Sequence, residues 1–207
     1  MKVSINSTTI LICIYLYLVL SNAPLFSQKK DYKKGNSKCC TEVIWHDGKI
    51  KRRLKILPSL IAEFINDTNQ RNNISNSDAN AKIVYSKAGV NLWEITHKKM
   101  KDTLKKGRIP SNLNGNYSPV FRDSSGQRRA LPGNIIVFME QRWDRKRVNR
   151  WAESNKLKII KRISSHHNAY IIETPPGMAS LDISNNLRDA RGVASVYPNW
   201  WKEVSPR

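Results

Sequence analysis

The residues best suited to chemistry in this chain are two adjacent histidines, His166 and His167, which follow two serines. Such a group suggests a metal site or a nucleophile with its base. Neighbouring side chains in a loop or strand point in different directions, however, and the nearest acidic residue, Glu173, lies a strand away. We therefore expect an exposed loop over 164–168, with no catalytic residue and no metal ligand there.

The cysteines give no stronger signal. Cys13 lies inside an apolar run, and Cys39 and Cys40 are adjacent. A disulfide between neighbours is strained, so pairing with another chain and the reduced state both stay open. Two thiols without a matching histidine or cysteine pair do not indicate zinc. We expect no metal and no cofactor.

Composition excludes two broad classes of protein. Lysine and arginine number 36 against 16 acidic residues, a formal charge of +20, and 40% of the 207 residues are hydrophobic. That hydrophobic share is enough for a core, which excludes a wholly disordered chain. Apolar runs of about 20 residues are absent outside the N-terminus, which excludes a protein that crosses a membrane many times.

The N-terminus has the layout of a secretory signal peptide. An apolar run over Ile10–Leu20 follows Lys2 and precedes small residues that end at Ser27. We expect a signal peptide over 1–27, cleavage near Ser27, and a secreted or periplasmic protein. Residues 28–40 then form a disordered basic leader. An uncleaved N-terminal anchor is the alternative.

Residues 41–107 have the pattern of a small α+β segment. The elements expected are strands over 41–46 and 49–57, a helix over 58–65, an exposed loop over 67–80, strands over 81–85 and 90–95, and a basic helix over 96–106. Asp47-Gly48 is a hairpin turn signal, and the apolar residues of 60–65 recur at the spacing of one helix face. Turn-rich residues 108–129 indicate a linker.

The C-terminal part predicts the order strand, helix, strand, strand, helix, strand. The elements expected are strands over 134–139, 157–163, 169–173 and 193–197, one helix capped by Asp144 and one helix capped by Ser180. This order is that of a ferredoxin-like βαββαβ open-faced sandwich, in which two helices cover one face of four antiparallel strands. The fold class is therefore α+β, and the other face of the sheet must meet water or a partner.

The residues of this unit resemble the N-terminal propeptide of secreted bacterial subtilisin-like serine proteases. The unit opens with LPGNIIV over 131–137 and closes with GVASVYPNWW over 192–201. The closing segment is similar to the G-V-x-x-A-x-P-N end of such propeptides, although Ser195-Val196 replaces the usual small residue. Residues 117–122 and 45–64 resemble segments upstream of the propeptide core. The resemblance places the domain over 130–201 and a tail over 202–207.

The resemblance implies a non-catalytic protein that binds and inhibits, or helps to fold, a subtilisin-like serine protease. In that family the open sheet face packs on two protease helices, and the C-terminal extension lies in the substrate cleft. The residues that would contact the partner here are Tyr197, Pro198, Asn199, Trp200 and Trp201. Deleting 198–207 is then expected to weaken protease binding and to leave the fold intact. No segment has the context of a serine-protease triad, so we expect no enzyme.

Other interpretations use the same residues. The chain could be an exported interaction module, or the remnant front end of a subtilase precursor, with no protease partner. A basic cluster with two tryptophans suggests nucleic acid instead: Arg142, Trp143, Arg145, Lys146, Arg147, Arg150 and Trp151. The strands lack stacking aromatic residues and export removes the chain from most nucleic acid, so a solvated helix face is the better explanation. An anionic membrane surface is an alternative partner.

Overall fold

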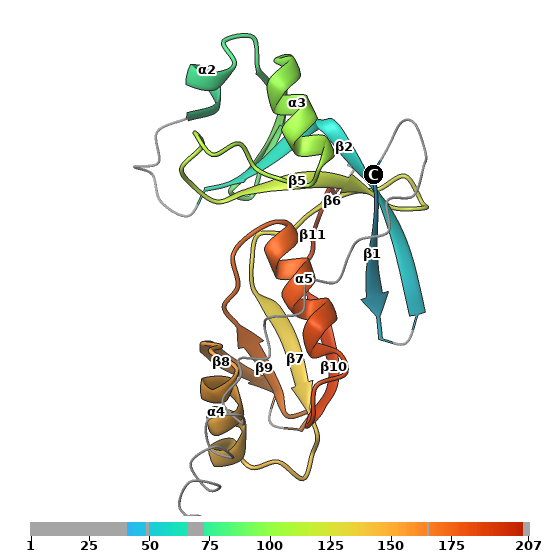
Figure 1. Ribbon diagram of the computed structural model, residues 1–207, viewed down its shortest axis with the longest axis vertical. Helices are drawn as coiled ribbons and strands as arrows, with labels where there is room; N and C mark the ends of the chain where they lie inside the picture. Colours follow the sequence, from blue (N-terminus) through green and yellow to red (C-terminus); the bar gives the residue numbers. More distant parts are fainter. Residues whose placement is uncertain (1–40, 49, 66–72, 165, 205–207) are drawn as a thin grey trace, which may run out of the picture. The chain divides into compact units, whose positions relative to one another are not determined.

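The computed structural model describes residues 41–48, 50–65, 73–164 and 166–204, shown in Figure 1. The expected signal peptide, the basic leader, Cys39 and Cys40 lie outside these residues. The described residues form an α+β fold, as the sequence predicts, and contain two antiparallel sheets.

The first sheet has seven strands in the order β11-β6-β5-β2-β4-β3, with β1 paired to β2. The strands are β1 (Glu42–Asp47), β2 (Ile50–Phe64), β3 (Lys82–Lys87), β4 (Val90–Glu94), β5 (Tyr117–Arg122), β6 (Arg128–Ala130) and β11 (Trp201–Lys202). Two helices accompany it, α2 (Asn73–Ser77) and α3 (Lys98–Lys105). The predicted hairpin is confirmed, since Val43 pairs with Leu54 across β1 and β2. Gly48 takes a positive φ of 61° at the turn, a conformation that favours glycine.

The helix predicted over 58–65 is wrong, because β2 continues through this range to Phe64. Ile61 pairs with Trp93 of β4 and with Pro119 of β5, so β2 lies inside the sheet. Residues 60–64 are all buried, including those on alternate faces. A strand buried on both faces loses the polar–apolar alternation by which strands are recognised. Pro58 lies in the irregularity between Leu57 and Ile61, where a strand tolerates proline.

The linker predicted over 108–129 contains β5, most of β6 and the turn between them. β5 pairs with β2 over two stretches of register and separates it from β6. The sheet that segment 41–107 helps to form therefore includes three strands from outside this segment: β5, β6 and β11. The segment is a part of this sheet and not a separate α+β domain.

The two ends of the first sheet meet through aromatic side chains. Tyr85 on β3 and Trp201 on β11 contact edge to face, with ring centroids 5.5 Å apart. Between them lies an apolar cluster whose fully buried members include Leu92 and Val120. The sheet therefore curls on itself and buries this face without a covering helix.

The opposite face of the first sheet packs against α3. Met100 and Leu104 of α3 join Ile61, Trp93 and Tyr117 in one buried cluster. The helix predicted over 96–106 is thus confirmed as Lys98–Lys105, and Gly107 (φ 72°) follows it.

The second sheet has four strands in the order β10-β7-β9-β8. Its elements are β7 (Ile135–Met139), α4 (Arg145–Ser154), β8 (Ile159–Ser164), β9 (Ala169–Ile172), α5 (Met178–Leu187) and β10 (Val193–Pro198). The predicted order of strands and helices is observed. Residues of both helices, such as Trp151 and Leu187, pack with Val137, Ile172 and Val196 in one cluster, so α4 and α5 share one face of the sheet.

One of the two predicted helix caps is confirmed. The Asp144 carboxylate accepts a hydrogen bond from the Arg147 backbone N–H at 2.7 Å and so caps α4. The Ser180 cap is wrong, because α5 begins at Met178. Ser180 is fully buried inside the helix, and its hydroxyl donates to the Asn134 carbonyl at 3.2 Å.

Strands of the first sheet also share an apolar cluster with helix α5. Leu181 of α5 packs there with Trp45, Leu54 and Phe121. The Asn185 side-chain amide donates to the Ile44 carbonyl at 3.1 Å. The described residues accordingly lie in one compact unit.

Candidate functional site

The uncovered face of the four-stranded sheet carries a strip of apolar side chains. Along β7, Ile135, Val137 and Met139 are buried toward the helices, whereas Ile136 and Phe138 are half-buried on the other face. The strand register places further residues on this outer face, because cross-strand partners share a face. We call the resulting set the apolar strip: Ile136, Phe138, Ile171 and Tyr197.

The strip is continuous across three strands. Ile136 pairs with both Tyr197 of β10 and Ile171 of β9. The rings of Phe138 and Tyr197 meet edge to face with centroids 5.7 Å apart, so the strands do carry partly exposed aromatic residues, contrary to the expectation from the sequence. All four side chains are partly exposed. A partner could therefore bury an apolar surface here, flanked by the exposed Lys161 of β8.

The five residues predicted to contact a partner do not form one free tail. Tyr197 belongs to the apolar strip, but Pro198 is buried and pairs with Ile135. The Asn199 backbone N–H donates to the Asn134 carbonyl at 3.3 Å. These three residues thus end the sheet.

The two tryptophans that follow pack against the first sheet. Trp200 contacts Trp45 at 5.3 Å and Phe121 at 5.8 Å between ring centroids, and its Nε1 is buried without a hydrogen-bond partner among the described residues. Trp201 pairs with Ala130 of β6 and contacts Tyr85. Tail deletion is therefore expected to damage the fold, contrary to the expectation from the sequence.

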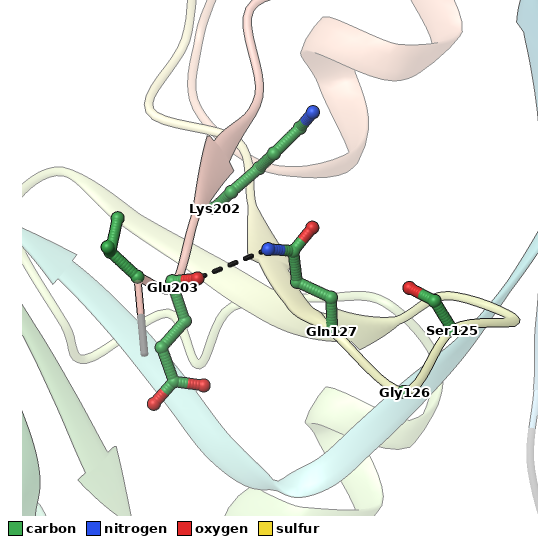
Figure 2. Close-up of a pocket in the computed structure, with 6 residues that line it drawn as sticks. Ser125, Gly126, Gln127, Lys202 and Glu203 are labelled. Carbon is green, nitrogen blue, oxygen red and sulfur yellow. Dashed lines mark hydrogen bonds between the residues drawn. The ribbon is translucent and has the colours of Figure 1, made fainter. Parts of the chain in front are cut away.

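A shallow polar hollow of about 540 Å³ lies beside this tail. It is lined by Ser125, Gly126, Gln127, Lys202, Glu203 and Val204. Figure 2 shows the Gln127 side chain reaching the Glu203 carbonyl, with Nε2 donating at 3.2 Å. Arg128 also forms a 2.6 Å ion pair with the Glu203 carboxylate. These contacts hold the tail against β6.

The turn beside the hollow has one perturbed acid. Burial by itself raises the pKa of Asp123. Hydrogen bonds from Ser125, Arg129 and the Gln127 backbone, together with the Arg129 charge, lower it by more, so the pKa lies below its ordinary value. Asp123 and Arg129 form an ion pair at 2.6 Å. Asp123 is therefore a structural carboxylate of the β5–β6 turn, because Ser125 and Gln127 belong to that turn and Arg129 lies in β6, which follows it.

The adjacent histidines lie at the surface. His166 and His167 are exposed between β8 and β9, as predicted, and the His166 carbonyl accepts a hydrogen bond from Gln141. His46 Nδ1 lies 3.3 Å from the Asn185 side-chain oxygen. Across the described residues, no three histidine, cysteine, aspartate or glutamate side chains gather closely enough to hold a metal ion.

The basic cluster around α4 does not offer aromatic rings to nucleic-acid bases. Trp143 and Trp151 are 7% and 8% exposed and belong to the core. Arg147 covers the Trp143 ring, with its guanidinium carbon 4.3 Å from the centroid. Base stacking needs an open aromatic face, so only the charges of this cluster can contact a partner.

The comparisons with known proteins give no relative. The chain matches no protein-family model, no curated protein and no solved structure. In the part of the chain that the structure describes, no helix has the length and apolar character needed to cross a membrane.

Proposed function

We propose that this chain is a non-catalytic, propeptide-like protein that binds and inhibits, or helps to fold, a subtilisin-like serine protease. Two sets of observations support the proposal. The segments over 131–137 and 192–201 resemble those of such propeptides. The sheet order β10-β7-β9-β8, with both helices on one face, agrees with the proposed ferredoxin-like arrangement.

The observation that carries the proposal is the apolar strip on the uncovered face. Partly exposed aromatic and branched side chains are typical anchors of protein interfaces. A partner that covers the strip removes apolar surface from water, at about 25 cal/mol per Å². A protein that binds only the folded protease also stabilises it by mass action, which is how a chaperone function would arise.

The structure changes which part of the chain we propose as the main contact. Trp200 and Trp201 lie in apolar clusters of the first sheet. Insertion of the tail into a substrate cleft would require these clusters to open. We therefore propose that the sheet face binds first, and that the tail contributes only after it has left β6. Secretion, or export to the periplasm, belongs to the same proposal and rests on the N-terminal residues.

The proposal can be tested with one substitution on the strip. Phe138→Asp places a charge on the proposed contact surface while the buried neighbours Val137 and Met139 stay in place. We expect inhibition of a panel of purified subtilisin-like proteases to weaken at least about tenfold, because a charge is desolvated in the interface. Ile83→Asp on β3 is the matched control, since Ile83 is 45% exposed and lies on the first sheet.

The time course separates the proposal from its alternative. Fast inhibition by the wild-type chain and slow recovery of activity would mean that the protease finally digests an inhibitor. An absence of inhibition at micromolar concentrations would favour an exported interaction module, or the front end of a protease precursor, with no protease partner. Equal loss of inhibition in Phe138→Asp and Ile83→Asp would contradict the strip as the contact surface.

A further inference from the structure

The exposed side of α3 carries a dense group of cations. We call this group the α3 lysine face: Lys98, Lys99, Lys101, Lys105 and Lys106. Arg108 follows two residues later, and Asp102 is the one acidic residue between 98 and 108. Lys101 is partly exposed and the other four lysines are exposed.

The fold fixes the direction of this face. Met100 and Leu104, four residues apart, are buried in the cluster beneath α3. Residues 98, 102 and 105 then fall on the opposite side of the helix, because one turn takes 3.6 residues. Since Asp78 also holds the start of α3 by accepting hydrogen bonds from the Thr96 and His97 backbone N–H groups, the lysines project from a rigid support.

Two of these charges do not serve the stability of the helix. Lys98 and Lys99 stand in the first turn, where the helix dipole disfavours cations. The ion pairs found among the described residues involve no lysine or arginine of 98–108. A face that concentrates cations outside these ion pairs, two of them at a cost to the helix, is suited to an anionic partner.

We propose that the α3 lysine face binds an anionic phospholipid surface by electrostatic attraction. Lysines supply point charges that suit a dispersed anionic surface, whereas nucleic-acid recognition favours the arginine fork. The apolar side of α3 is buried in the core, so the helix lies against the phospholipid surface and does not insert into the bilayer. This surface is separate from the apolar strip, and the inference does not depend on the proposed protease partner.

The test measures partitioning of the full chain onto vesicles. Neutral phosphatidylcholine vesicles report any contribution from the apolar N-terminus, and vesicles with about one-third phosphatidylglycerol add the anionic charge. We expect stronger binding to the anionic vesicles than to the neutral ones, and we call this difference the anionic excess. It should be lost between about 50 and about 300 mM salt, because the Debye length shortens.

Two charge-reversed variants test the location. The first combines Lys98→Glu, Lys99→Glu and Lys105→Glu. The matched control on α4 combines Arg145→Glu, Lys146→Glu and Arg150→Glu, which changes the net charge equally and leaves Arg147 on Trp143. We expect the anionic excess to fall at least about tenfold in the first variant and less than about twofold in the control.

A third variant should gain binding, which a folding defect cannot imitate. Asp102→Asn removes the one carboxylate among the lysines, and the anionic excess should rise up to about fivefold. Equal losses in the two reversed variants would overturn the proposal, because total charge would then drive binding. A loss of duplex-DNA binding in the first variant with unchanged vesicle binding would also overturn it, in favour of nucleic acid.

Discussion

Removal of residues 200–207 should destabilise the whole described fold. Trp200 packs against Trp45 and Phe121 in one cluster, and Trp201 closes the first sheet against Tyr85 in another. Truncation of a buried tryptophan costs about 3–5 kcal/mol. Both side chains keep some exposure, so we expect about 3 kcal/mol for Trp200→Ala and about 2 kcal/mol for Trp201→Ala.

The truncated chain should then lose about 5 kcal/mol, because the two tryptophans pack in different clusters. Natural domains of this size have a free energy of unfolding of only about 5–15 kcal/mol. Urea unfolding followed by far-UV circular dichroism measures the loss without relying on tryptophan fluorescence. Val204→Ala is the control: Val204 is 62% exposed, and its truncation should change stability by less than about 0.5 kcal/mol.

Trp200→Phe makes the test sharper. The indole Nε1 of Trp200 is buried without a partner among the described residues. Such a donor costs about 1–3 kcal/mol, so its removal offsets the smaller ring, and the change should stay within about 1 kcal/mol. If the truncated chain unfolded at the wild-type urea concentration, the tail would not belong to the fold and our account of the two clusters would be refuted.

Two further substitutions test other parts of the fold. Gly192→Ala should lower stability by about 2–4 kcal/mol in a thermal melt, because Gly192 has a φ of +86° and an added Cβ would overlap the Trp143 ring; an unchanged melting temperature would contradict that close approach. Asp78→Ala should cost about 1–2 kcal/mol through the lost hydrogen bonds from Thr96 and His97. Burial raises the pKa of Asp78, but these hydrogen bonds outweigh it and hold the pKa below its ordinary 3.8, so the folded state favours the carboxylate. The difference between wild type and variant should therefore be constant from neutral pH to about pH 4 and shrink as the pH falls further, since protonation removes the contribution; a difference that grew in acid would reverse this assignment.

Local sequence patterns predicted the second sheet well. Each strand and helix there is short, and its apolar residues recur at one period, since the helices cover one face of the sheet and leave the other partly exposed. Asp144 was recognisable as a cap because capping depends only on residues within one turn. The Ser180 prediction failed because a local pattern alone does not choose between neighbouring cap positions. The cap is Gly177, and the Ser180 hydroxyl is hydrogen-bonded with Thr174 and with the distant Asn134 carbonyl.

The errors in the first sheet come from burial that depends on distant residues. Residues 60–64 look helical because both faces of β2 are apolar, and the second face is buried only because Tyr85 and Trp201 bring β3 and β11 together. Residues 117–122 look like part of a linker because turn-rich segments flank them. Their strand exists through pairing with β2, more than fifty residues earlier in the chain.

The candidate surfaces divide in the same way. The strand over Ile136 and Phe138 and the lysine-rich segment 98–106 can both be recognised from the sequence. Only the tertiary structure decided that Trp200 and Trp201 pack inside the fold, because their ring partners, Trp45, Phe121 and Tyr85, lie far away in the chain. Composition and periodicity determine which side chains can bury a face, whereas contacts between distant segments determine which faces stay open to a partner.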